Sequence, residues 1–300
     1  MPLSLASMLG ILRDPPPEFV FEIAADGIAI SRTRPPASVR HAPLAPEVIV
    51  PSPVKSNVLD GEAFALAVRK ILPQATGRGR RSAALILPDN SVRIAVLDFD
   101  KLPSKEEERR PLINFRLRKS VPFDIDEAAL SYFPQAGNKV VVALSPSEIV
   151  SQYEAPFRAA GLHPGLVTVS SLAMLDLMPS QGSIVVARRS PGALTAVGLK
   201  DGVVTIARSL ELSVFDTTLD PLTEIADDIY PTLAYIEDQT GARPDKLFLA
   251  GFGSDSGDSA TRLSIELGIA VETINEPYPG LAGYLKSIAA KPSAVKRKAA

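Results

Sequence analysis

The sequence predicts an α/β protein made of two related lobes. Each half of the chain contains a hairpin of apolar strands and strands that lead into helices. This order differs from the regular strand-helix alternation of a Rossmann fold. Because the chain has 300 residues, of which 46% are hydrophobic and 22% charged, it is able to bury a substantial core.

The composition disfavours several kinds of chemistry. A net charge of -2 and a pI of about 5.8 provide no basic field, so nucleic acid is not expected as a partner. The absence of cysteine excludes thiolate catalysis, cysteine-ligated zinc and disulfides. His41 and His163 lie in proline-containing segments, which disfavours a histidine-based metal site or a Ser-His-Asp triad. No apolar run approaches the roughly 20 residues that span a bilayer.

Both ends of the chain are expected to lie outside the lobes. Residues 1–18 form an N-terminal segment without the basic region and cleavage site of a signal peptide. Its apolar residues have helical spacing, which predicts a frayed end or a short helix packed on the domain rather than a membrane-surface helix: Leu5, Met8, Leu9 and Leu12. Residues 291–300 form a basic tail, which we expect to be solvated.

The first elements are a hairpin and a helix. Strands are predicted at Phe19–Ile23 and Gly27–Ser31, joined by a tight turn in which Gly27 is able to adopt positive φ. The proline-rich segment up to Pro53 favours an edge strand or a loop. Asp60 then opens a helix whose apolar face comprises Phe64, Val68, Ile71 and Leu72.

The central stretch, from Leu85 to Phe133, carries strong structural signals and no catalytic ones. Two strands lead into a helix at which Ser104 and Glu107 have capping-box spacing. Acidic residues at its start and basic residues at its end match the helix dipole. Pro111 is expected either to kink this helix or to mark its true beginning.

The next segments complete the first half. A strand is predicted at Lys139–Leu144, followed by a helix for which Ser145 is the expected N-cap residue and Pro146 the first helical residue. A short strand at Leu166–Val169 then leads into a helix that begins near Ser171. Residues 179–182 are typical of a domain boundary.

The second half repeats this plan. Asp201 and Gly202 join two apolar strands, which is a strong hairpin signal. A helical stripe interrupted by Pro231 follows, comprising Leu222, Ile225, Ile229, Leu233 and Ile236. Leu247–Ala250 is predicted as a buried strand that runs into a glycine-containing turn, and the last helix is expected near Leu281–Ile288.

The central stretch and its flanks resemble PilM, the actin-like cytoplasmic protein of type IV pilus assembly. The similar segments follow the order of that family and cover the chain from about Phe19 to Ile288. They are Leu102-Pro103, Val121–Glu127, Ser131–Phe133, Ala160–Val167, Ile225–Gln239 and Leu247–Gly253.

The resemblance implies an actin-like (ribonuclease H-like) fold of two lobes around a cleft. Lobe 1 is then expected to comprise residues 19–180, with a small inserted subdomain at about 83–144. Lobe 2 is expected to comprise residues 181–290. Because only a short link separates Ser209 from Pro221, the lid subdomain that family members carry there is expected to be reduced.

The resemblance also implies a function. Family members bind the cytoplasmic N-terminal peptide of a PilN-like single-pass inner-membrane protein, in a groove between the inserted subdomain and the core of lobe 1. The expected role is a non-catalytic scaffold of a type IV pilus or related secretion complex. Such a scaffold is cytoplasmic and reaches the inner membrane only through its partner.

The expected nucleotide site departs from the family pattern. The Asp-x-Gly of the first phosphate loop corresponds to Glu22-Ile23-Ala24, and the Asp and Gly of the second correspond to Ala187 and Arg189. Arg188 and Arg189 retain the ability to attract phosphate, but the second loop has no carboxylate for Mg²⁺.

We therefore expect neither hydrolysis nor a resident cofactor or metal, and ATP with Mg²⁺ is not favoured. The residues that remain candidates for a degenerate nucleotide cleft are Asp26, Gly27, Gly251, Gly253 and Ser254.

Two alternatives stay open. An active actin-fold ATPase or sugar-kinase relative would need acidic metal ligands in both loops and a closing subdomain. A GspL-like cytoplasmic domain of a type II secretion system would share the fold and the scaffolding role.

Overall fold

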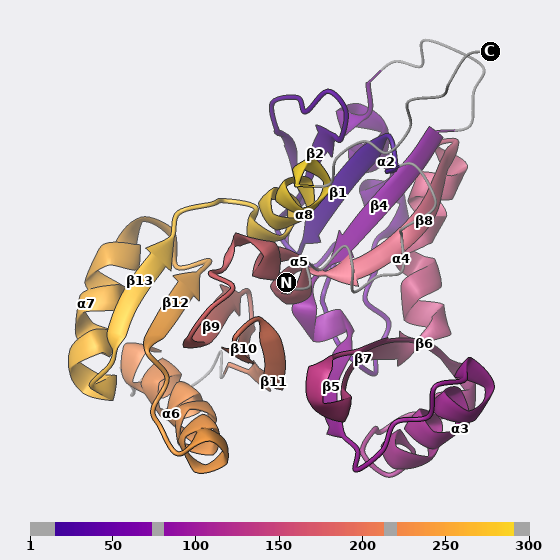
Figure 1. Cartoon of the computed structure of the whole chain (residues 1–300). Coiled ribbons are helices and arrows are strands. Elements are labelled where there is room, and N and C mark those ends of the chain that lie inside the picture. The colour runs from indigo at the N-terminus through magenta and orange to yellow at the C-terminus, as the bar shows by residue number, and fades with distance from the viewer. Residues whose placement is uncertain (1–15, 74–80, 213–220, 291–300) are drawn as a thin grey trace, which may run out of the picture.

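A computed structural model describes residues 16–73, 81–212 and 221–290. The N-terminal apolar pattern, the basic tail and most of the expected lid link lie outside these residues. The described chain forms two lobes and a smaller subdomain that lies below the first lobe in the view of Figure 1.

Lobe 1 is built on a five-stranded mixed sheet with the order β3-β2-β1-β4-β8. Its strands are β1 (Phe19–Ala24), β2 (Gly27–Arg32), β3 (Arg40–Pro43), β4 (Arg81–Leu87) and β8 (Leu162–Val169). The first three are antiparallel, whereas β1, β4 and β8 are parallel to one another. The predicted hairpin is therefore confirmed, and it forms one side of the sheet.

The glycine of this hairpin is required for a reason other than the one predicted. Gly27 does not adopt positive φ. Instead, a Cβ atom at Gly27 would lie 2.8 Å from the carbonyl oxygen of Ala42 and 2.1 Å from Nε2 of His41, both in β3. Gly27 therefore permits the close approach of the neighbouring strand.

Helices α2 (Gly61–Ile71) and α4 (Ser147–Ala159) pack against each other in lobe 1. The Asp60 side chain accepts a hydrogen bond from the amide of Ala63, which confirms the predicted N-cap. Phe157 of α4 packs edge-on against Phe21 of β1 and Phe64 of α2, with ring centroids 4.8 and 6.0 Å apart. These contacts join the helices to the sheet.

The predicted N-cap at Ser145 is wrong. Strand β7 (Lys139–Pro146) runs through this residue, and α4 begins at Ser147 without a side-chain cap. The Ser145 hydroxyl donates instead to the carbonyl oxygen of Ser91, because both residues are buried at the same place.

The inserted subdomain is a three-stranded antiparallel sheet with the order β5-β7-β6, covered by α3. Its elements other than β7 are β5 (Arg93–Asp98), α3 (Glu106–Leu117) and β6 (Ala128–Pro134). The expected start at Ala83 is wrong, because that residue lies in β4 and pairs with β1 and β8 of the lobe 1 sheet.

Helix α3 also differs from its prediction at the start. Its N-cap residue is Lys105, which provides no side-chain cap, so Ser104 and Glu107 do not form a capping box. Arg109 donates instead to the carbonyl oxygens of Pro103 and Ser104. The helix begins five residues before Pro111 and continues past it.

Lobe 2 repeats the sheet order of lobe 1, with the order β11-β10-β9-β12-β13. Its strands are β9 (Ser183–Ser190), β10 (Ala193–Lys200), β11 (Val203–Glu211), β12 (Lys246–Ala250) and β13 (Ala270–Ile274). Asp201 and Gly202 have φ values of 48° and 77°, which confirms the predicted turn between β10 and β11. Helices α6 (Pro221–Thr240) and α7 (Ser256–Leu267) cover one face of this sheet.

The last helix belongs to the other lobe. Helix α8 (Pro279–Ala289) was expected within lobe 2, but it packs against α5 (Ser170–Ala173) and the adjoining 3-10 turn at Met174–Leu177. This arrangement is possible because Gly280 and Gly283 provide no side chain where the backbones meet. The last described residues of the chain therefore lie on lobe 1.

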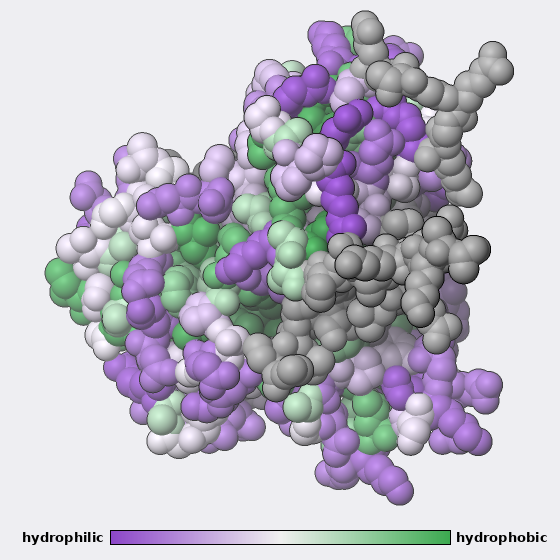
Figure 2. Space-filling view, turned by 45° about the horizontal axis from the view of Figure 1, so that its top comes forward, coloured by the Kyte–Doolittle hydropathy of each residue, from purple (hydrophilic) through white to green (hydrophobic). Residues whose placement is uncertain are grey.

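The two lobes share an apolar interface. One face of the lobe 2 sheet packs under α6 and α7, and the other contributes Val186, Val197 and Phe248 to the main core of lobe 1. Hydrophobic residues gather toward the middle of the molecule in Figure 2, whereas hydrophilic residues spread over its outer faces. The lobes are thus packed together rather than linked by a single hinge.

Candidate functional site

Two cavities lie at the junctions of these parts. The first, of about 540 Å³, is the interlobe cleft, and it lies where the β1–β2 turn faces the ends of β9 and β12. The second, of about 570 Å³, lies between the inserted subdomain and lobe 1, and we call it the subdomain groove.

The interlobe cleft contains some of the predicted residues. Asp26, Gly251 and Gly253 line it. Gly27 is buried beneath His41, and the exposed Ser254 donates its hydroxyl hydrogen to Asp255; neither residue lines the cleft. As nucleotide-binding residues, all five remain predictions.

Gly251 has a structural reason to be glycine. Its φ is +79°, and a Cβ atom there would lie 2.1 Å from the carbonyl oxygen of Arg189. The turn after β12 therefore packs directly on the end of β9.

An ion-pair cluster joins the lobes at the inner edge of the cleft. Arg188 of β9 donates to Glu22 of β1 at 3.2 Å and to Asp89 at 3.4 Å. The side chains are 10%, 2% and 0% exposed, respectively, so this cluster is buried from water. We call these three residues the interlobe clamp.

Backbone and hydroxyl groups complete the clamp. Glu22 accepts from the amide of Leu281 at 2.8 Å and from the hydroxyl of Ser170. Asp89 accepts from the amide of Ser171 at 2.8 Å. Both carboxylates are therefore held by an arginine and by the starts of α5 and α8, which offsets much of the cost of burying charge.

The clamp changes the chemistry expected of the first phosphate loop. Glu22 was identified as a replacement for a metal-binding aspartate, and Arg188 as a residue able to attract phosphate. The two side chains are paired with each other instead. No cluster of three potential metal ligands occurs among the described residues.

The clamp is not predicted from the sequence, in which Asp89 has the context of a turn residue. A signal was nevertheless available. Glu22 and Arg188 are charged residues in mainly apolar strands, and Asp89 lies two residues after the end of a third. Buried charges are rarely unpaired, so such residues predict a partner in the fold.

The outer part of the cleft is aromatic and mixed in charge. The rings of His41 and Tyr278 are stacked, with centroids 5.7 Å apart. Burial raises the pKa of the Tyr278 hydroxyl, and the nearby carboxylates of Asp26 and Glu22 raise it further. The phenol therefore stays neutral and available as a hydrogen-bond donor.

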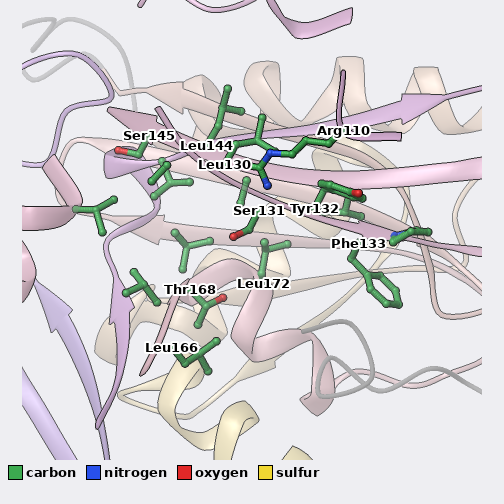
Figure 3. Close-up of a pocket in the computed structure, with 18 of the residues that line it drawn as sticks. Arg110, Leu130, Ser131, Tyr132, Phe133, Leu144, Ser145, Leu166, Thr168 and Leu172 are labelled. Carbon is green, nitrogen blue, oxygen red and sulfur yellow. The ribbon is translucent and has the colours of Figure 1, made fainter. Parts of the chain in front are cut away.

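The subdomain groove is mainly apolar, and its lining comes from both sides. Figure 3 shows side chains of the inserted subdomain opposite those of lobe 1. They are Leu130, Ser131 and Leu144 on the first side, and Leu166, Thr168 and Leu172 on the second.

A polar group lies at the α3 end of the groove. The Arg110 side chain extends toward Leu130 and Ser131 in Figure 3. The Tyr132 hydroxyl donates to Glu106 of α3. The pKa of Tyr132 is raised to about 12, mainly by burial and also by this hydrogen bond. The groove thus combines an apolar floor with charged groups at one end.

Edge strands border the groove. β6 is an outer strand of the three-stranded sheet and β8 is an outer strand of the lobe 1 sheet. Edge strands present backbone donors and acceptors that an added extended segment is able to pair with. The groove is therefore bordered by one edge of each of two sheets.

Two sheets of equivalent order, separated by a cleft at the ends of their parallel strands, define the actin-like (ribonuclease H-like) fold. The inserted three-stranded sheet agrees with the fold expected from the sequence. No family model matches the sequence, and no curated protein matches it closely enough to be counted as a relative.

Solved structures support the fold. A chain of the PilM-PilN type IV pilus biogenesis complex is similar with a TM-score of 0.72 and 20% identity, over 92% of this chain and 98% of that one. A Bacteroides thetaiotaomicron protein with an actin-like ATPase fold and unknown function gives 0.55 and 12%, over 93% and 98%.

The cytoplasmic domain of EpsL, an inner-membrane component of the type II secretion system of Vibrio cholerae, gives a TM-score of 0.55 and 9% identity, over 91% of this chain and 95% of that one. Among the helices in the described parts of the chain, none combines the length and the apolar character needed to cross a membrane.

Proposed function

We propose that this protein is a non-catalytic scaffold of a type IV pilus or related secretion complex. In this proposal, the subdomain groove binds the cytoplasmic N-terminal segment of a PilN-like single-pass inner-membrane protein. The scaffold itself is cytoplasmic and is held at the inner membrane by that partner.

The observation that best supports the binding role is the subdomain groove. It has the size, the apolar lining and the open strand edges that suit an extended segment. The similarity to a chain of the PilM-PilN complex and to cytoplasmic EpsL supports a partner in an inner-membrane assembly. Fold similarity alone does not establish function, so the proposal depends on the groove.

The interlobe clamp supports the absence of catalysis. Actin-like folds bind Mg-nucleotide at the ends of these strands, where Glu22 is paired with Arg188 in this protein. A metal ion or a phosphate at this place would have to separate a buried ion pair, which is costly. The cleft is therefore proposed to lack nucleotide hydrolysis.

The binding role is tested by blocking the groove. Ser131 is exposed on β6 and faces the groove, so Ser131→Arg fills it without disturbing the core. The measurement is isothermal titration with a synthetic peptide comprising the cytoplasmic N-terminus of the proposed PilN-like single-pass partner. We expect binding to wild type and at least a roughly tenfold loss in the variant, as for a disrupted interface centre.

Thr261→Arg provides the matched control. Thr261 is exposed on α7 of lobe 2, so the same side chain is introduced away from the groove. This variant should bind the peptide like wild type. Equal affinity in Ser131→Arg, or no affinity in wild type, would contradict the proposed groove.

The absence of nucleotide chemistry is tested separately. Titration of Mg-ATP should give no low-micromolar binding, and a phosphate-release assay should give no turnover above buffer. Measurable turnover would favour the alternative of an active actin-fold ATPase.

A further inference from the structure

Two short segments of lobe 1 take part in both the clamp and the subdomain groove. In residues 88–92, Asp89 belongs to the clamp and Val92 lines the groove. In residues 168–172, Ser170 and Ser171 bind the clamp carboxylates while their neighbours line the groove. The backbone of these two segments therefore lies behind the interlobe cleft and also forms the lobe 1 side of the subdomain groove. We call residues 88–92 and 168–172 the groove floor.

The two segments are held tightly to one another. The amide of Ser171 donates to Asp89 at 2.8 Å, which joins them directly. The Ser91 hydroxyl lies 2.9 Å from the Tyr153 hydroxyl, and the Ser91 carbonyl accepts from Ser145 of β7 at 2.9 Å. A displacement of Asp89 would therefore be transmitted to residues 168–172 through Ser171, and to the inserted subdomain through Ser91 and Ser145.

Lobe 2 also holds the wall that the inserted subdomain contributes. Gln135, directly after β6, donates to the carbonyl oxygen of Val204 at 3.0 Å and accepts from its amide at 2.8 Å. The preceding residues, Phe133 and Pro134, line the groove. Lobe 2 thus contacts the floor through Arg188 and the opposite wall through β11.

We infer that Arg188 binds the carboxylates at the inner edge of the cleft and is thereby a positioning residue for the subdomain groove. Its guanidinium holds Glu22 and Asp89 together across the two lobes, and Asp89 and Ser171 then fix the groove floor. Because the Arg188 guanidinium is the cation that joins the lobes, the groove keeps its shape without a bound ligand. The effect on a partner segment rests on the proposed function, whereas the effect on the groove floor does not.

The first experiment needs no partner. Hydrogen exchange followed by mass spectrometry is compared between wild type and Arg188→Met, because methionine keeps an unbranched, largely apolar side chain but carries no charge. We expect exchange to rise by about tenfold in residues 88–92 and 168–172, and to stay unchanged in α7. Arg189→Met is the matched control, because Arg189 is an exposed neighbour that lines the cleft outside the clamp.

Arg188→Lys keeps the measurement interpretable if Arg188→Met does not fold. Lysine retains the charge but loses the forked geometry that reaches both carboxylates, so its exchange should fall between wild type and Arg188→Met. If exchange rises only around residues 188–190, and both groove segments stay protected, the inference is overturned.

The second experiment uses the peptide defined above. Its dissociation constant should rise by about tenfold in Arg188→Met, less in Arg188→Lys, and not at all in Arg189→Met. Unchanged affinity in Arg188→Met would overturn the positioning role. If the peptide binds no variant and not wild type either, the proposed function fails, while the exchange experiment still decides the role of Arg188.

Discussion

Single residues in this protein are constrained by what approaches them. Gly27 and Gly251 both lie at turns facing the cleft. Gly27 permits the close approach of β3, whereas Gly251 permits the close approach of Arg189 and also adopts positive φ. Glu22 and Arg188 are constrained by each other. The positions that suggest an eroded phosphate site are therefore occupied by groups with structural partners.

Replacing Gly27 by alanine should lower the free energy of unfolding by about 1–3 kcal/mol, as in other overpacked sites. The added methyl group would collide with the Ala42 carbonyl, which is backbone and cannot rotate away. Chemical denaturation provides the measurement. Gly61→Ala, where no atom lies within 4 Å of the added carbon, should leave stability nearly unchanged and serves as the control.

Tyr153 predicts a pH dependence. Burial raises the pKa of its hydroxyl, so the folded state holds the proton more tightly than the unfolded chain does. The stability that follows from this difference is complete below the ordinary tyrosine pKa of 10.0 and is lost as the pH rises above it.

Urea unfolding of wild type and Tyr153→Phe between neutral pH and pH about 10.5 tests this dependence. The variant should be less stable at neutral pH by about 1–2 kcal/mol, because Ser91 and Asn57 lose a buried partner. Its stability should also fall less steeply in alkali, although Tyr284, whose pKa burial also raises, contributes to both proteins. Equal slopes would contradict the assignment.

Among the helices and strands, α8 has the position with the largest consequence. This helix follows lobe 2 in the sequence but packs on α5, and the amide of Leu281 in its first turn binds Glu22. Close backbone contact makes this possible, because Gly283 lies against Ala173 and Met174. The clamp therefore depends on a helix from the end of the described chain.

Gly283→Ala should destabilise the protein by about 1–3 kcal/mol. The new Cβ atom would lie 2.2 Å from the Ala173 carbonyl oxygen, so α8 must move away from α5. Gly257→Ala, on the exposed first turn of α7 with open space around it, should be neutral or stabilising by up to about 1 kcal/mol. Thermal unfolding of both variants gives the comparison, and similar effects would contradict close packing of α8.

The two lobes and the inserted subdomain each contact the other two. Lobe 1 and lobe 2 are joined by an apolar interface and by the interlobe clamp. The inserted subdomain contacts lobe 2 through β5 and β11, and through the paired hydrogen bonds of Gln135. The subdomain groove is thereby enclosed by parts that also hold one another.

Gln135→Ala should expose the Val204 amide, because that amide loses its acceptor. Hydrogen exchange at β11 should become faster, and stability should fall by about 1–2 kcal/mol for the two lost bonds. Gln239→Ala, at an exposed position of α6, provides the same substitution away from the interface and should have no effect. Unchanged exchange at Val204 would show that the contact is not kept in solution.

Much of the fold could be predicted from the sequence, because its signals are local. The Asp201-Gly202 hairpin, the Asp60 cap and the stripe of α6 depend on residues close in the chain, and all three are confirmed. The predictions that failed concern competition between local and distant partners. Ser145, for example, has the sequence context of an N-cap but donates to Ser91, far away in the chain.

The candidate site could be predicted only in part. The sequence indicated a two-lobed α/β chain and the turns at Asp26 and Gly251, because these depend on residue type and short spacing, and the resemblance to the PilM family implied the loss of acidic residues from the second loop. The three-dimensional structure was needed to establish that Glu22, Asp89 and Arg188 meet, that β4 belongs to the lobe 1 sheet rather than to the inserted subdomain, and that α8 packs on lobe 1. The physical reason is that the pairing of a buried charge and the docking of a helix depend on which surfaces the fold brings together, and spacing along the chain does not encode that directly.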